Sequence, residues 1–189
     1  MPDWVLAVER AYVAAATGTP PTMTTLPEDD LIARARAAAG AVASHHLAVG
    51  SPRSLGLVVA GADSCEAAML SVAAHSTWFS PQDIRVSGLG ADTLAHSLHG
   101  REVPMAEALA CDIVCVHAPI ALAAAQLRRG THVNVLAAAT LDDDLTKLAT
   151  IIHEAPGLGE LAAGLVDGRQ LDELTVFVIG DAAIAMSVL

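Results

Sequence analysis

The feature that most constrains this chain is a buried strand that runs into a glycine-containing turn and then into a helix. Residues 55–59 form a continuous apolar run, and an alanine-rich stretch of helical character follows the turn. This order is the context in which G-x-G-x-x-G/A motifs bind the pyrophosphate of a dinucleotide. The three motif positions hold Val59, Gly61 and Ser64, so only the middle glycine is present. The sequence therefore predicts the fold around such a motif more strongly than it predicts the ligand.

Two residues of the turn argue against a bound pyrophosphate. Val59 replaces the first glycine, and valine does not readily adopt the tight turn that glycine permits. Asp63, with Glu66 three residues later, is typical of a capping box, in which the carboxylate binds the free N–H groups of the helix. A phosphate would need the same groups, and two like charges about 4 Å apart near a surface repel by about 4 kcal/mol. We therefore expect no cofactor, or NAD(P) if one is bound.

Short apolar runs alternate with helical segments from residue 55 onward. The predicted strands cover residues 55–59, 84–87, 112–116, 132–136, 150–153 and 175–179. The predicted helices cover residues 4–16, 31–46, 64–75, 91–98, 104–110, 120–127, 142–148 and 159–165. This alternation predicts an α/β fold: a Rossmann-like, mainly parallel sheet with helices on both faces, preceded by two N-terminal helices. We divide the chain into an N-terminal helical segment, 1–50, and a Rossmann-like domain, 51–189.

Charge and composition exclude several classes of partner. The formal net charge is −11 with ten Lys and Arg, which argues against nucleic acid and anionic membranes. No apolar run approaches the roughly 20 residues of a membrane span, and Asp3 and Glu9 stand where a signal peptide would be basic. Three cysteines form no disulfide framework, so we expect a reducing, cytoplasmic location.

Several segments together resemble the ornithine cyclodeaminase and mu-crystallin family, with its related alanine and imine dehydrogenases. The first helix carries Val-Leu-Ala-Val-Glu-Arg-Ala-Tyr over residues 5–12, and residues 37–43 resemble the helix that leads into the family's nucleotide domain. Residues 130–134, Gly-Thr-His-Val-Asn, match the family's G-x-H-V-N turn and strand, and residues 159–161 and 172–177 resemble its closing segments. The resemblance implies a Rossmann domain and NAD(P)-dependent chemistry.

The departures from the family affect its catalytic residues. The interval between the first two helices, residues 18–30, is too short for the substrate domain that the resemblance implies, and the family's catalytic lysine would lie there. The single lysine, Lys147, follows Asp143 by four residues, the spacing of an exposed ion pair. Residues 137–139 are alanines where the family has its proton-transferring aspartate, and residues 87–90 lack the acid that binds ribose. We therefore expect a pseudoenzyme with no assignable catalytic residue.

Five residues are candidates for a binding site in the crevice of the sheet. His117 follows the third predicted strand at its carboxyl end, where parallel sheets bind ligands, although a structural role for this histidine is also open. The full candidate set for cofactor binding is Gly61, Ser64, Ser87, His117 and Asn134. In addition, the position of the family's carboxylate-binding arginine falls near Ala35, between Arg34 and Arg36.

No metal site is expected from the sequence. Cys111, Cys115 and His117 have even spacing, but no fourth ligand or Cys-x-x-Cys accompanies them, and buried cysteine behaves as a small hydrophobe. His45 and His46 end a helix, where protonated imidazoles favour the helix dipole.

Two functions follow from these observations. The first is a catalytically degenerate cyclodeaminase-like protein that acts as an accessory, scaffold or partner-binding subunit. It would be a homodimer or a hetero-oligomer, joined through Trp4, Val8, Tyr12 and the apolar residues 182–189. The second is a repurposed NAD(P)-dependent reductase or lyase, or a binder of another small molecule in the Rossmann crevice.

Overall fold

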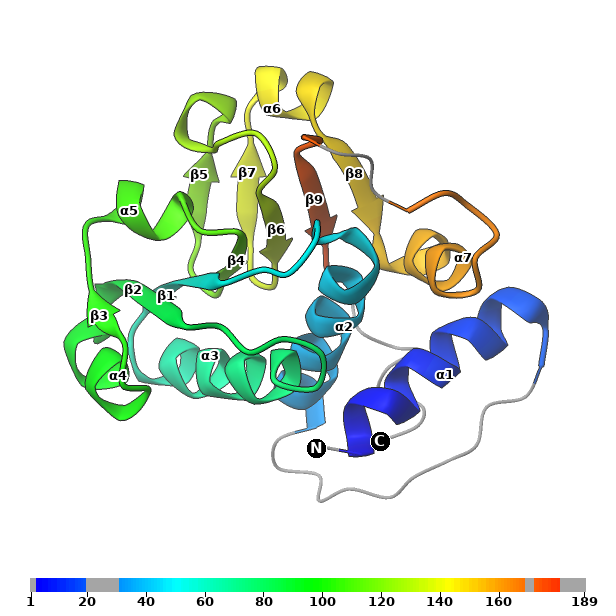
Figure 1. The fold of residues 1–189 in the computed structure, drawn as a ribbon, viewed down its shortest axis with the longest axis horizontal. Helices are drawn as coiled ribbons and strands as arrows, with labels where there is room; N and C mark the ends of the chain where they lie inside the picture. The colour runs from blue at the N-terminus through cyan, green and yellow to red at the C-terminus, as the bar shows by residue number, and fades with distance from the viewer. Residues whose placement is uncertain (1–2, 20–30, 169–171, 181–189) are drawn as a thin grey trace.

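A parallel sheet forms the centre of the molecule. The computed structural model describes residues 3–19, 31–168 and 172–180 (Figure 1). Within them, the strands of the main sheet are β1 (Ser54–Ala60), β2 (Asp83–Leu89), β3 (Arg101–Glu102), β4 (Ile113–Val116), β6 (His132–Val135), β8 (Thr150–His153) and β9 (Thr175–Val178). Their order is β3-β2-β1-β4-β6-β9-β8, and every pair is parallel. The predicted Rossmann-like sheet is therefore confirmed.

The strand order reverses between β1 and β4. From β1 the chain moves outward to β2 and β3, then returns to the other side of β1 and builds β4, β6 and β9. In an open parallel sheet, the connections leaving the two strands at such a reversal diverge and leave a crevice at the carboxyl ends. The residues that follow β1 and β4 therefore lie at the place where this fold binds ligands.

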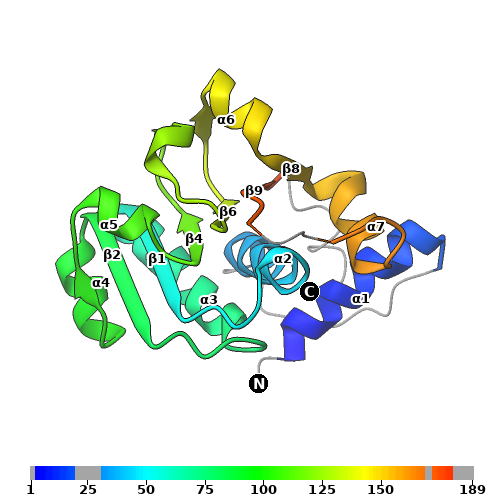
Figure 2. The ribbon, with the colours of Figure 1, turned by 45° about the horizontal axis from the view of Figure 1, so that its top comes forward.

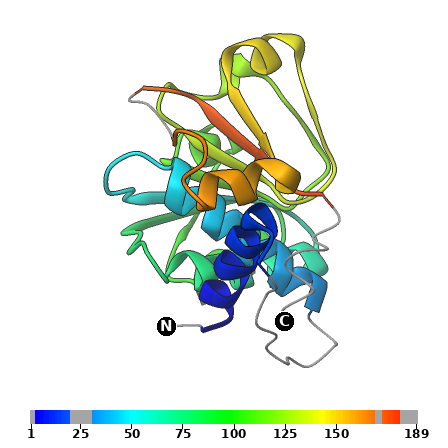
Figure 3. The same cartoon turned by 90° about the vertical axis from the view of Figure 1, so that its right-hand side faces the viewer.

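Helices cover both faces of the sheet. They are α1 (Asp3–Thr17), α2 (Leu31–Leu47), α3 (Ala62–His75), α4 (Ala91–Ser97), α5 (Met105–Leu109), α6 (Asp143–Leu148) and α7 (Gly159–Ala162). Helix α2 lies between α3 and α1 (Figure 2), and α1 packs against α7 (Figure 3). Alternate residues of β1 divide between two cores. Leu55, Leu57 and Val59 pack with α1 to α4 and α7, whereas Val58 packs on the opposite face with α5 and α6.

The apolar face of α1 belongs to this core. Val8 and Tyr12 are both 0% exposed, and the Tyr12 hydroxyl donates a 2.6 Å hydrogen bond to Oε1 of Glu154. The prediction that Val8 and Tyr12 form a dimer surface is therefore wrong, because α2 and α7 cover that face. Trp4 is partly buried against the same core, and residues 182–189 lie outside the described part of the chain.

The six predicted strands are confirmed, but the helix predicted at residues 120–127 is wrong. Ile120–Leu122 is a strand, β5, that pairs in parallel with β7 (Ala139–Leu141) in a separate two-stranded sheet, and Ala124–Gln126 is a short 3-10 helix. Alanine favours helix, but that preference is weak, and the pairing with β7 overrides it. The short strands β3 and β7 were not predicted. Helix α7 is shorter than predicted, since Gly164 takes φ 68° soon after its end.

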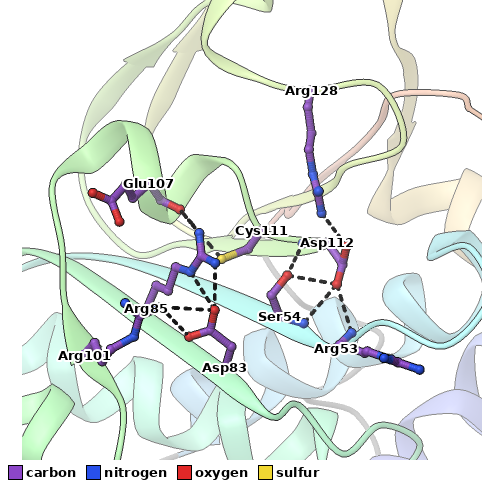
Figure 4. Close-up of polar contacts among 9 residues, drawn as sticks. All are labelled: Arg53, Ser54, Asp83, Arg85, Arg101, Glu107, Cys111, Asp112 and Arg128. Carbon is purple, nitrogen blue, oxygen red and sulfur yellow. Dashed lines mark hydrogen bonds and ion pairs between the residues drawn. The ribbon is translucent and has the colours of Figure 1, made fainter.

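Charged side chains connect the strands at the amino-terminal edge of the sheet (Figure 4). The Asp112 carboxylate accepts hydrogen bonds from the backbone N–H groups of Arg53 and Ser54, both at 2.9 Å, and from the Ser54 hydroxyl, and it pairs with Arg128. Burial alone would raise the pKa of Asp112, but these hydrogen bonds and the nearby guanidinium lower it below its usual value. The loop before β4 is thereby fixed to the start of β1. None of the helices in the described part of the chain combines the length and the hydrophobicity that a membrane span requires.

Candidate functional site

A cavity of about 610 Å³ lies at the reversal of the strand order. The turn after β1 contributes Gly61, Asp63 and Ser64, the segment after β4 contributes His117, and α2 contributes Arg36. Three of the five predicted site residues, Gly61, Ser64 and His117, are thus brought together. The apolar part of the wall comes from the start of α2 and from the segment after β6, including Leu31, Ile32, Leu136 and Ala137.

The first turn of α3 is open to this cavity. The helix begins at Ala62 after Gly61, whose φ of 117° and ψ of −173° suit glycine, and no side chain caps its first turn. Ser64 Oγ accepts the N–H of Ala60 at 2.6 Å and donates to the Gly61 carbonyl at 2.8 Å, which fixes the turn. The predicted capping box is wrong: Asp63 lies inside the helix with an exposed side chain, so its carboxylate does not occupy the N–H groups.

Val59 is compatible with the turn, because the position that must be glycine is in the neighbouring strand, β2. Val59 remains in β1 and is paired with Gly88 of β2. Gly88 has φ 117°, and a Cβ atom placed there would lie 1.9 Å from the carbonyl oxygen of Val59. The close approach of β1 and β2 therefore depends on Gly88, and the sharp bend of the chain is made two residues after Val59, at Gly61.

Two side-chain nitrogen atoms at the cavity have no hydrogen-bond partner within the described part of the chain. Nε2 of His117 is buried without one, and so is Nε of Arg36. His117 is only 7% exposed, and burial, with a smaller effect from His75, lowers its pKa to about 3. The imidazole is therefore neutral at pH 7, and its Nε2 atom is a buried hydrogen-bonding group without a partner among the described residues.

Asn134 and Ser87 do not line this cavity. Ser87 is 6% exposed within β2, beside Val58 of β1. Asn134 is fully buried, where its Nδ2 donates to Ser44 Oγ at 2.8 Å and its Oδ1 accepts from His132 Nε2 at 3.1 Å. Ser44 Oγ also lies 2.9 Å from Nε2 of His75. Asn134 thus joins α2 and α3 to the centre of the sheet through buried hydrogen bonds.

Arg36 is the cavity residue that the predicted site omitted. The resemblance pointed to this part of α2 but could not say which of the two arginines faces the crevice. The single lysine lies at the opposite edge of the sheet from this cavity. Lys147 lies in α6, just before the first residue of β8, and therefore at the amino-terminal edge of a fully parallel sheet, whereas the cavity is at the carboxyl ends.

Several solved structures share the fold of this chain at low sequence identity. No protein-family model and no curated protein sequence matches the chain. An archaeal alanine dehydrogenase dimer with bound NAD matches with TM-score 0.79 and 18% identity, covering 98% of this chain and 88% of that one. The Thermococcus litoralis Δ1-pyrroline-2-carboxylate reductase, in complex with NADH and L-proline, gives 0.77 and 17%, covering 98% and 89%. A probable ornithine cyclodeaminase from Bordetella pertussis gives 0.64 and 20%, covering 84% and 64%.

These matches confirm the resemblance at the level of fold. The ornithine cyclodeaminase and the alanine dehydrogenase are the kinds of protein whose motifs the sequence resembles. Identities of 17–20% establish a shared architecture and leave activity to be argued from this chain's own residues.

Proposed function

We propose that this chain binds a phosphate-bearing small molecule, with an NAD(P)-type dinucleotide as the first candidate, in the cavity between β1 and β4. The observation that supports this most is the uncapped first turn of α3 beside the unpaired guanidinium nitrogen of Arg36. A helix N-terminus presents free N–H groups and a partial positive charge of about one half, both of which favour phosphate. An arginine adds a full charge and a planar set of donors.

The charge balance of the cavity favours an anion more than the sequence suggested. Asp63 is the acidic residue among the lining side chains, and it is exposed. At a separation of about 4 Å, repulsion falls from about 4 kcal/mol near a protein surface to about 1 kcal/mol in bulk water, so exposure weakens this penalty. Attraction to Arg36 at a similar distance offsets what remains.

We further propose that the chain lacks the lysine-dependent chemistry of the family that it resembles. Lys147 belongs to the opposite edge of the sheet, and residues 137–139 are alanines, of which Ala137 lines the cavity after β6. His117 is the titratable group best placed to contact a ligand, but a pKa near 3 makes it a neutral hydrogen-bonding group at pH 7 and a very weak base. Binding without that catalysis is the function that these residues support.

A thermal-melt titration tests the proposal. The purified chain is melted with NAD+, NADH, NADP+ and NADPH, and a ligand at 100 times its Kd stabilises by about 2.7 kcal/mol. Arg36→Gln should weaken the best ligand at least tenfold, whereas the matched variant Arg34→Gln, two residues away on the same helix and outside the cavity lining, should leave its Kd unchanged. Equal losses in both variants would contradict a role for Arg36.

A second candidate function is that of an accessory or scaffold subunit in a homodimer or hetero-oligomer. It is favoured by the archaeal alanine dehydrogenase, which is a dimer, and by large exposed side chains: Leu89 at 74%, Leu148 at 69% and Leu165 at 62% exposure. Sedimentation equilibrium of the full chain tests it, because a monomer across the whole concentration range would rule out self-association.

A further inference from the structure

Three metal-ligand side chains from two helices meet outside the crevice. Glu9 projects from α1, and His45 and His46 are near the end of α2. Nε2 of His46 lies 3.0 Å from Oε1 of Glu9, and one ligand atom from each of the three residues lies within 4.8 Å of the other two. Glu9 is 37 positions from His46 in the sequence, yet the three residues form a compact group of two imidazoles and one carboxylate.

The spacing of these atoms is close to what a metal ion requires. Zinc binds imidazole nitrogen and carboxylate oxygen at about 2.0–2.2 Å, which places tetrahedral ligand atoms about 3.3 Å apart. The Glu9–His46 pair is already near that separation. The His45 ligand atom lies within 4.8 Å of the other two, so it must approach by at most about 1.5 Å to reach that separation.

The surroundings orient one ligand and leave space beside it. The ring of Trp78 stacks on His45 with ring centres 4.4 Å apart and an angle of 13°, and the His46 ring lies edge-on to His45 at 4.9 Å. A cavity of about 600 Å³ is lined by His45 and Trp78 and extends to Arg53 and Gln82. A metal ion held by three protein ligands would have its remaining position near this cavity, open to water or a small ligand.

We propose that Glu9, His45 and His46 bind a divalent transition-metal ion of the zinc type. Imidazole and carboxylate together suit zinc and its neighbours in the first transition row, and suit magnesium or calcium less well. The ion joins α1 to α2 and so adds to the stability of the N-terminal helices.

This site is separate from the ligand cavity between β1 and β4. Ile32 lines that cavity at the start of α2, and His45 is near the other end, about 20 Å away at 1.5 Å per residue. A metal titration without nucleotide therefore tests this proposal alone, and its failure would leave the proposed function unaffected.

The competing explanation is that Glu9 and His46 form only a hydrogen bond between helices. In that case His45 contributes nothing to metal affinity, although it stands beside the pair. His45 is exposed and its substitution leaves the Glu9–His46 contact in place, so the His45→Gln variant separates the two explanations.

The experiment is isothermal titration calorimetry of the full chain with Zn²⁺, after a chelator has removed bound metal. The chain carries Trp4→Phe, so that Trp78 is the only tryptophan and its fluorescence can be followed. We expect one Zn²⁺ per chain, a higher melting temperature with the ion, and a change in Trp78 fluorescence at the same stoichiometry. His45→Gln, His46→Gln and Glu9→Gln should each weaken binding by at least the 10- to 100-fold loss typical when a supporting residue of a metal site is removed.

The matched control is His96→Gln, which removes an exposed histidine from α4, outside the cluster. It should bind Zn²⁺ as tightly as the background protein. The proposal is overturned by the absence of saturable 1:1 binding, by unchanged affinity in His45→Gln, or by an equal loss in His96→Gln. Circular dichroism of each variant establishes that it is folded, and His45→Gln alone decides the matter if the Glu9 variant is not.

Discussion

Replacing Asn134 by alanine should destabilise the protein strongly, although the residue was first predicted to bind a ligand. Asn134 is 0% exposed and hydrogen-bonded to Ser44 and His132, both of which are also 0% exposed. Alanine removes both hydrogen bonds and leaves two buried polar groups short of a partner. Each such group costs about 1–3 kcal/mol, so the free energy of unfolding should fall by about 2–6 kcal/mol.

The assay is urea unfolding followed by circular dichroism, with melting temperature as a second measure. For a chain of this size a loss of 1 kcal/mol lowers the melting temperature by about 2–4 °C, so we expect a decrease of roughly 4–24 °C. His117→Leu is the comparison: it removes a buried nitrogen that has no hydrogen-bond partner among the described residues, and it should cost less than about 1 kcal/mol.

A double-mutant cycle identifies the interaction responsible. Ser44→Ala and Asn134→Ala remove opposite ends of one 2.8 Å hydrogen bond, so their effects should not add, and the coupling should be about 0.5–3 kcal/mol. Two outcomes would refute the reasoning: a cost below about 0.5 kcal/mol for Asn134→Ala, as for a surface substitution, or strictly additive effects.

Three further predictions follow from the core. Gly88→Ala should cost about 3 kcal/mol or more in urea unfolding, because its Cβ would lie 1.9 Å from the Val59 carbonyl oxygen at φ 117°. Burial lowers the pKa of His75 to about 4 from 6.5, so the unfolded chain binds the proton more readily. Stability should therefore fall by roughly 3 kcal/mol as pH drops from 6.5 through 4, and this slope should be smaller in His75→Leu. Burial raises the pKa of Cys115 to about 12, so a thiol reagent should modify it only on unfolding, after the partly exposed Cys65.

Each of these has a clear contrary result. Gly50 also has a positive φ, of 63°, but has open space around it, so Gly50→Ala should cost only about 1 kcal/mol; an equal cost at Gly88 would contradict the steric argument. A His75→Leu variant with the pH slope of the original chain would assign that slope to other groups. Rapid modification of Cys111 and Cys115 in the folded chain would contradict their burial.

The strands were predictable because their residues satisfy a local rule. Runs such as residues 55–59 are short and apolar and are followed by a glycine-containing turn, and a strand buried on both faces needs nothing else. The segment 120–127 failed because its alanines favour helix weakly and its true partner, β7, is a distant strand that no local pattern announces. Pairing between segments that are separated in the sequence cannot be predicted from the local pattern of either segment.

The same limit explains the errors at the site. Asp63 and Glu66 have the spacing of a capping box, but the helix begins one residue before Asp63, so the carboxylate stands inside the first turn. Asn134 follows the sequence pattern of a crevice residue, yet its strand is central and α2 covers it. His45 was assigned to the helix dipole as a protonated group, whereas burial and the neighbouring His46 lower its pKa.

The most direct test of the ligand cavity is to map, by nuclear magnetic resonance, the backbone amides that respond to NADH and NADPH. The account predicts that the largest shifts lie in the first turn of α3, at Gly61, Asp63 and Ser64, with a second group around Arg36 and His117. Shifts confined to other surfaces, or none at millimolar nucleotide, would contradict the claim that this crevice binds a phosphate-bearing ligand.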